Sequence, residues 1–192
     1  MKKIIILFLF AILFSSCDLF STRSPEQPEA PRTSYQTPTT PEILIQNLKD
    51  SFKDKVVENY IMCFVDSSFT SRRFRFYPSA GSGSKYPFLL NWNLQGERQY
   101  FINLANSIDK STQILVDFTN EEKNFQGDST SYSAAYSITV PTQDEQKPKY
   151  YQGNIHLTLI RDSRLQWVIS DWQDIKNENY PSWSELKGGY YL

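Results

Sequence analysis

Two neighbouring stretches decide the fold: KYYQGNIHLTLIR at residues 149–161 and LQWVISDWQD at residues 165–174. Apolar and polar side chains alternate in both, which is typical of antiparallel strands with one buried face. A two-residue turn at 162–163 would mix the two faces, whereas a three-residue loop, Asp162-Ser163-Arg164, pairs Leu159 with Trp167. We therefore predict the three-residue loop, which places Asp171 beside Ile155 on the apolar face.

The same period of two occurs earlier, at residues 114–118 and in SYSAAYSITV at 131–140. In the second stretch Tyr132 and Tyr136 share one face with apolar side chains, while the other face is rich in serine. SRRFRF at 71–76 also alternates, so we expect a strand whose arginines point at water. These arginines are Arg72, Arg73 and Arg75.

A helical period of apolar residues precedes or separates the strands, at residues 41–52, 56–64 and 93–108. Thr40 and Asn93 are expected to cap two of these helices. A short terminal helix is predicted in PSWSELKGG at 181–189, with its two glycines as the stop and Trp183 docked on the domain. The Gly- and Ser-rich segment 79–87 lacks the G-x-x-x-x-G-K pattern that cradles phosphate, so a flexible loop is expected there.

The N-terminus has the order of a secretory signal. Lys2 and Lys3 precede an unbroken apolar run at residues 4–14, and Ser15-Ser16-Cys17 follow. A membrane-spanning helix needs roughly 20 apolar residues, so this run is too short to be one. An uncleaved apolar start with an incidental cysteine is the alternative interpretation.

The stretch Phe14-Ser15-Ser16-Cys17 resembles the lipobox of bacterial lipoproteins. The resemblance implies cleavage after residue 16, a diacylglyceryl thioether on Cys17 and a third acyl chain, such as palmitate, on the new amine. Two or more such chains are enough for stable membrane anchoring. The resemblance places the protein in the cell envelope, with its domain outside the cytoplasm and in the periplasm. Asp18 does not decide between the inner and the outer membrane.

Composition divides the rest of the chain and limits its partners. Residues 17–40 are rich in proline and poor in apolar side chains, which predicts a lipid-anchored linker, and residues 41–192 form one domain. Twenty Lys and Arg against 21 Asp and Glu give a net charge of −1, and removal of Lys2 and Lys3 gives 18 against 21, or −3. This mild acidity argues against nucleic acid as a partner.

Lipidation of Cys17 would leave Cys63 as a single, buried thiol, so neither a disulfide nor a cysteine-based metal site is expected, and no cofactor is predicted.

The strand motifs resemble those of the nuclear-transport-factor-two-like superfamily, also called SnoaL-like or cystatin-like cone folds. They are YxGxxxLxLxR at 151–161 and WxIxxWxD at 167–174, and VVENYIMCFVDSSFTSRRFRF at 56–76 resembles the family's helix running into its first strand. The resemblance covers residues 41–175. It implies an α+β fold in which N-terminal helices pack on a curved antiparallel sheet, a cone-shaped half-barrel with a pocket at its open end. Family members include isomerases, dehydratases, ligand binders and oligomerisation modules, so fold does not decide function.

Three residues are the candidates for catalysis inside such a cone. Asp171 in an apolar cavity would have a raised pKa and could act as a general base. Tyr132 and Tyr136 could donate to a developing oxyanion. The competing interpretation is a solvated or capping Asp171 and two core tyrosines. His156, the only histidine, falls on the face opposite Leu157 and is expected to point outward.

Two functions from different classes therefore remain open. The first is an envelope lipoprotein with a non-catalytic domain that binds a ligand or a partner protein, including a second copy of itself, and it predicts a filled or purely apolar cone. The second is a small isomerase or dehydratase with Asp171 as base and a tyrosine as acid. It predicts an open pocket where these groups converge.

Overall fold

The computed structural model describes residues 34–191. The predicted signal peptide at 1–16, the lipidation site Cys17 and the linker up to residue 33 lie outside the described residues. The helices are α2 (Pro41–Asp54), α3 (Val57–Ile61), α4 (Ser82–Lys85), the 3-10 helix η1 (Pro87–Asn91), α5 (Leu94–Ser107) and α6 (Trp183–Tyr191). The strands are β1 (Arg75–Tyr77), β2 (Leu115–Gln126), β3 (Ser129–Thr139), β4 (Tyr150–Arg161) and β5 (Trp167–Lys176). Of the helices in this part of the chain, none is long and apolar enough to cross a membrane.

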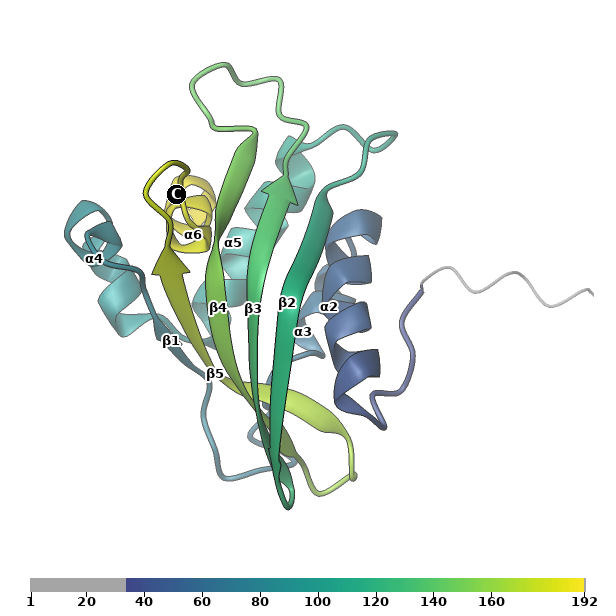
Figure 1. Cartoon of the computed structure of the whole chain (residues 1–192). Helices are drawn as coiled ribbons and strands as arrows, with labels where there is room; N and C mark the ends of the chain where they lie inside the picture. Colours follow the sequence, from purple (N-terminus) through teal and green to yellow (C-terminus); the bar gives the residue numbers. More distant parts are fainter. Residues whose placement is uncertain (1–33, 192) are drawn as a thin grey trace, which may run out of the picture. The chain divides into compact units, whose positions relative to one another are not determined.

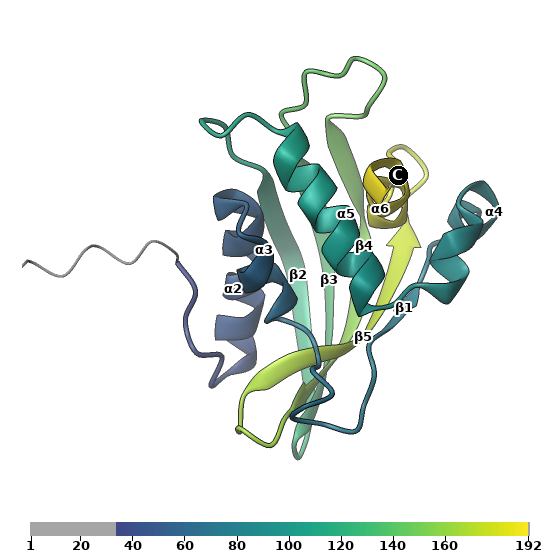
Figure 2. The same cartoon turned by 180° about the vertical axis from the view of Figure 1, so that it is seen from behind.

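The strands form one curved sheet in the order β1-β5-β4-β3-β2. The strands β2 to β5 pair antiparallel, and the short β1 runs parallel to β5. Figures 1 and 2 show α2, α3, α5 and α6 on one face of this sheet, while its other face is open. The predicted α+β class, with helices packed on a curved antiparallel sheet, is confirmed.

Local sequence signals fix the two long helices. The Thr40 side chain accepts a hydrogen bond from the Ile43 amide, and Asn93 accepts one from the Gly96 amide at 3.1 Å, so both predicted N-caps are confirmed. The expected loop at 79–87 was wrong in part, because it contains α4 and the start of η1. The Ser79 and Ser82 hydroxyls, 2.8 Å apart, close the turn that begins α4.

We predicted that the terminal helix α6 stops at its two glycines. This was wrong, because the helix continues to Tyr191. At Gly188 the helix presses against the ring of Tyr86, and a Cβ atom there would overlap this ring. Gly189 has open space around its Cα. The glycine at 188 therefore serves close packing and not helix termination.

The predicted register of the last hairpin was wrong. Arg161 pairs with Trp167, so the connection is the five-residue loop 162–166, and Leu159 pairs with Ile169. Asp162 organises this loop by accepting hydrogen bonds from the amides of Arg164 (2.8 Å) and Gln166 (3.2 Å). Loops of five residues held by a buried aspartate are hard to tell from shorter ones by periodicity alone.

A β-bulge further along β5 changes which face its residues occupy. Leu159 pairs with Ile169 but Thr158 pairs with Asp171, so Ser170 is an extra residue without a partner across the ladder. The Ser170 hydroxyl donates to the Thr158 carbonyl at 3.2 Å and to Asp171 at 2.7 Å. The bulge inverts the alternation that follows it, so Ile155 pairs with Asp174 and not with Asp171.

Residues 34–40, which the sequence assigns to the linker, contact the domain. Asn47 on α2 accepts a hydrogen bond from the Gln36 amide at 2.9 Å and donates one to the Gln36 carbonyl at 2.6 Å. The Pro38 carbonyl accepts from the Trp167 amide at 2.8 Å. This segment therefore runs along α2 and joins the beginning of β5.

Candidate functional site

The inner face of the sheet is the place where the cone fold would hold a pocket, and here α6 fills it. Trp183 is fully buried. Its ring packs edge-on against Trp172 on β5, with centroids 4.6 Å apart, and against Phe52 on α2 and Tyr136 on β3. A further ring, Phe118 on β2, stacks on it at 6.3 Å. One side chain of the last helix thus occupies the middle of the cone.

The first turn of α6 is held by a buried carboxylate on β5. Asp174 is only 2% exposed, and its Oδ2 accepts from the Ser184 amide at 2.7 Å and from the Ser184 hydroxyl at 2.5 Å. Its Oδ1 accepts from the Tyr136 hydroxyl at 2.7 Å, and that hydroxyl accepts from the Trp183 amide at 2.6 Å. A carboxylate that receives amides at a helix start satisfies donors that would otherwise be buried and unpaired.

This arrangement uses one predicted tyrosine with a carboxylate that sequence reasoning missed. Tyr136 lies on the inner face as expected, and burial, followed by the charge of Asp174, raises the pKa of its phenol. Asp174 was missed because the bulge at Ser170 places Asp174, and not Asp171, on the inner face. A sequence signal for Asp174 was available, since it is the last residue of the WxIxxWxD motif.

Asp171 lies on the other face of the sheet. Its Oδ1 accepts a hydrogen bond of 2.6 Å from the guanidinium group of Arg75 on β1. The Asp171 side chain is 14% exposed, whereas the Arg75 side chain is 64% exposed. It shares a shallow hollow with Thr158 and His156. His156 is exposed as expected, with its Nδ1 2.7 Å from the Ser133 hydroxyl. The prediction that Asp171 lies on the inner face was wrong, because the bulge at Ser170 turns its side chain to the other face.

Tyr132 is buried on the inner face but does not meet Tyr136 at a common point. Its hydroxyl donates to Glu121 on β2 at 3.0 Å. Burial first, and this hydrogen bond second, raise the pKa of its phenol. The structure therefore brings none of the three predicted site residues together: Asp171 pairs with Arg75, Tyr136 with Asp174, and Tyr132 with Glu121.

A second buried polar group lies between α5 and α6 and was also missed. Lys187 on α6 and Glu97 on α5 are both completely buried and form an ion pair, and the Tyr60 hydroxyl donates to the second oxygen of Glu97 at 3.1 Å. Burial lowers the pKa of the Lys187 ammonium, and the Glu97 carboxylate opposes this effect. The signal in the sequence was a lysine within the apolar stripe of a helix, beside Leu186.

Aromatic rings surround the ammonium of Lys187. It lies 3.9 Å from the ring centroid of Phe76 and 4.3 Å from a ring of Trp172, with further rings at 5.9 to 6.0 Å. The more distant rings belong to Phe74, Trp92 and Tyr100. Such a cage attracts a cation through the negative faces of its rings. The cone therefore contains a built ammonium site, and the chain's own lysine occupies it.

A metal site is not formed by the described side chains. Within residues 34–191, no three His, Cys, Asp or Glu side chains gather closely enough to hold an ion. Cys63 is fully buried and its thiol donates to the Asn59 carbonyl, and burial raises the pKa of this thiol. It has the surroundings of a structural cysteine.

Comparison with known proteins supports the fold. No protein-family model matches the sequence, and no curated protein matches it. Among solved structures, a nuclear transport factor 2 (NTF2-like) superfamily protein from Salmonella enterica has a TM-score of 0.51 and 9% identity, with 72% of this chain and 87% of that chain covered. An NTF2-like protein from Streptomyces avermitilis, named provisionally as a dehydratase, has a TM-score of 0.51 and 7% identity over 71% and 92% of the two chains. A provisional scytalone dehydratase from Novosphingobium aromaticivorans has a TM-score of 0.53 and 9% identity over 69% and 78%.

Proposed function

We propose that this protein is a lipid-anchored cell-envelope protein whose cone domain is non-catalytic and binds a ligand or partner protein through its surface. The observation that carries this proposal is the position of α6. Its side chains Trp183 and Lys187 take up the interior in which a substrate would have to lie, and both are fully buried. The buried charged groups Asp174, Glu97 and Lys187 are paired with other groups of the chain.

The anchor in this proposal rests on the signal-like sequence that ends at Cys17. It is tested by growing cells with an alkyne-labelled palmitate and detecting the label on the protein. We expect label on the wild type and none on Cys17→Ser. Label that persists in Cys17→Ser, or an unlabelled wild type, would contradict the anchor.

The non-catalytic interior is tested by hydrogen exchange on the folded protein. If α6 is a permanent part of the core, its amides exchange as slowly as those of the central strand β4, because both open only on global unfolding. Amides of α6 that exchange much faster than those of β4 would mean that the cone opens. That result would reject the proposal and favour a dehydratase- or isomerase-type enzyme, the class that the names of two solved neighbours suggest.

A further inference from the structure

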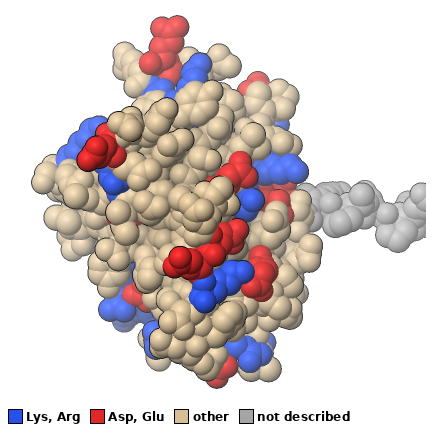
Figure 3. All heavy atoms as spheres, viewed as in Figure 1, with Lys and Arg blue, Asp and Glu red and all other residues tan. Residues whose placement is uncertain are grey.

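The arginines of the described chain gather around one region of the surface. Residues 34–191 contain six arginines, and five of them line three adjoining hollows. These five are Arg72, Arg73, Arg75, Arg98 and Arg164. The open face of the sheet, in contrast, carries acidic and basic side chains next to one another in Figure 3. Arginine is enriched at protein interfaces because its planar group binds carboxylates and stacks on apolar surface.

Two of the hollows join into one groove, which we call the arginine groove. The first has a volume of about 480 Å³ and runs from Glu58 to Arg164, and the second, of about 440 Å³, lies against Arg72 and Arg73. They share Val65, Leu94 and Gln95. The groove therefore lies between the segment that follows α3 and the first turn of α5.

The floor of the arginine groove is apolar. Phe64, Val65 and Phe74 are buried beneath it, and Leu94 is half-buried. Met62 on its edge is 43% exposed, although methionine is a flexible apolar residue that usually packs. The surface can therefore accept apolar side chains of a second molecule.

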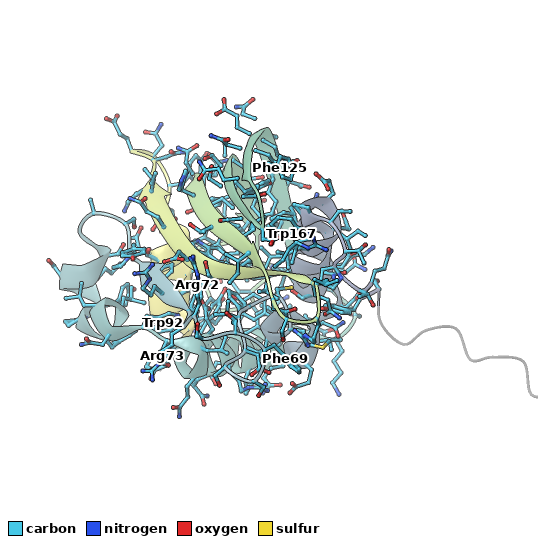
Figure 4. The ribbon with its side chains drawn as sticks, turned by 90° about the horizontal axis from the view of Figure 1, so that it is seen from below. Phe69, Arg72, Arg73, Trp92, Phe125 and Trp167 are labelled. Carbon is cyan, nitrogen blue, oxygen red and sulfur yellow. The ribbon has the colours of Figure 1, made fainter. Side chains whose placement is uncertain are left out.

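The charges along the groove are only partly balanced. Arg98 binds both oxygens of Glu58, at 2.5 and 3.0 Å, and Arg164 binds Asp162 at 2.6 Å. Arg72 and Arg73 are exposed, and within residues 34–191 neither side chain has an ion pair or hydrogen-bond partner. Figure 4 shows these two arginines on the same side of the molecule. Two unneutralised cations thus lie next to an apolar floor.

The N-terminus of α5 adds positive potential to the part of the groove that Arg72 and Arg73 line. Asn93 caps the Gly96 amide, while the amides of Leu94 and Gln95 have no partner in the described part of the chain. These two amides carry the positive end of the helix dipole, in the hollow that Arg72 and Arg73 line. A carboxylate placed here would meet two guanidinium groups and a helix start.

From this geometry we infer that the arginine groove binds an acidic, apolar segment of another protein. Its carboxylates pair with Arg72 and Arg73, and its apolar side chains cover Leu94 and Met62. A membrane surface fits less well, because Glu58 and Asp66 also line the groove and the chain without residues 1–16 has a net charge of −3. The inference rests on the proposed function, since it names the class of partner that a binding domain of this kind would take.

The test is photo-crosslinking in cells with the full chain. A photoreactive phenylalanine analogue replaces Gln95, which is exposed and lies in both hollows, and a control probe replaces Gln113, which is exposed and lines neither of them. Mass spectrometry identifies the crosslinked peptide. We expect an adduct from position 95 only, to a segment of another protein that carries net negative charge and apolar residues.

A pair of double variants tests the role of the arginines. Arg72→Glu/Arg73→Glu should lower the yield of the adduct by at least about tenfold, because two arginines that become buried at an interface dominate its affinity. The matched control Lys53→Glu/Lys110→Glu makes the same charge change at exposed lysines outside the groove and should change the yield less than twofold.

Several outcomes would overturn the inference. In the crosslinking experiment they are an adduct to lipid, to residues 18–33 of the chain itself, to a second copy, or to a neutral or basic segment, and also a yield at position 95 no higher than at the control position. In the variant experiment it is an equal loss of adduct in both double variants. None of these outcomes requires α6 to open or Cys17 to be unmodified. The failure of this inference is therefore separate from the failure of the proposed function, which hydrogen exchange and lipid labelling measure.

Discussion

The Tyr136 hydroxyl lies 2.7 Å from Asp174 and donates a hydrogen bond to it, and the same hydroxyl accepts from the amide of Trp183 at 2.6 Å. Two inward side chains of the sheet thus hold the first turn of the last helix. In an open cone such a tyrosine and carboxylate would be available to a substrate. In this protein their hydrogen-bonding atoms are used to fix the helix that fills the cone.

Asp174→Asn should therefore destabilise the protein far more than Asp171→Asn. Asparagine keeps an acceptor oxygen for one of Ser184 and Tyr136 but turns an amide donor toward the other, which predicts a decrease of about 2 kcal/mol in the free energy of unfolding. Asp171 pairs with an Arg75 that is mostly exposed, so solvent screening limits its loss to less than about 1 kcal/mol. Urea denaturation measures both values. Equal losses would mean that the two carboxylates do not differ in burial as the bulge requires.

Trp183→Ala should leave a cavity in the middle of the cone. Removing a fully buried Trp side chain costs about 3–5 kcal/mol, and the cavity should accept indole. We expect indole to raise the Tm of Trp183→Ala and to leave the Tm of the wild type unchanged. A wild type that is itself stabilised by indole would show that its interior already admits a ligand.

Glu97 and Lys187 should behave as a coupled pair. Lys187→Met leaves the buried Glu97 without its counter-charge and should lower the free energy of unfolding by about 3–5 kcal/mol. The double variant Glu97→Gln/Lys187→Met removes that charge and keeps an acceptor for Tyr60, so it should be more stable than Lys187→Met alone. Unfolding of the two single variants and the double variant checks this. Losses that simply add would contradict the pairing.

The two neighbouring glycines of α6 should respond in opposite directions to alanine. Gly188→Ala forces a Cβ into the ring of Tyr86 and should destabilise by about 1–3 kcal/mol. Gly189→Ala meets open space and should stabilise the helix by about 0.5–1 kcal/mol. Thermal unfolding of both variants is the measurement. The same sign for both would reject the close approach at Gly188.

Stability should fall as the pH rises above about 10. Burial raises the pKa of Tyr60, Tyr100 and Tyr136 in the folded protein above the ordinary value of 10.0. Above that value the unfolded chain loses these protons while the folded chain keeps them, so each phenol lowers the free energy of unfolding by up to about 1.4 kcal/mol per pH unit. The part of the tyrosinate absorbance that belongs to these three buried phenols should therefore appear only with unfolding, and Tyr136→Phe should have a shallower pH dependence. Full ionisation of the tyrosines near pH 10 in the folded protein would contradict this.

Much of the fold was predictable because its signals are local. Periodicity located the helices and strands, and the side chains of Thr40 and Asn93 set where two helices begin. The inward positions of Tyr132 and Tyr136 also followed from alternation along a single strand. The candidate site was less predictable, because it depends on how two strands and a helix meet.

The sequence by itself determined the α+β class, the helix caps and the faces of β3, since each follows from residues close together in the chain. It also predicts, through Cys17 and its surroundings, an address in the envelope that awaits its test. Only the tertiary structure decided which carboxylate points inward and what fills the cone. Periodicity did not locate the extra residue at Ser170 that exchanges Asp171 for Asp174, because a bulge appears only against its partner strand. The packing of Trp183 and Lys187 beneath the sheet joins residues far apart in the chain, and burial between distant elements leaves little local pattern to read.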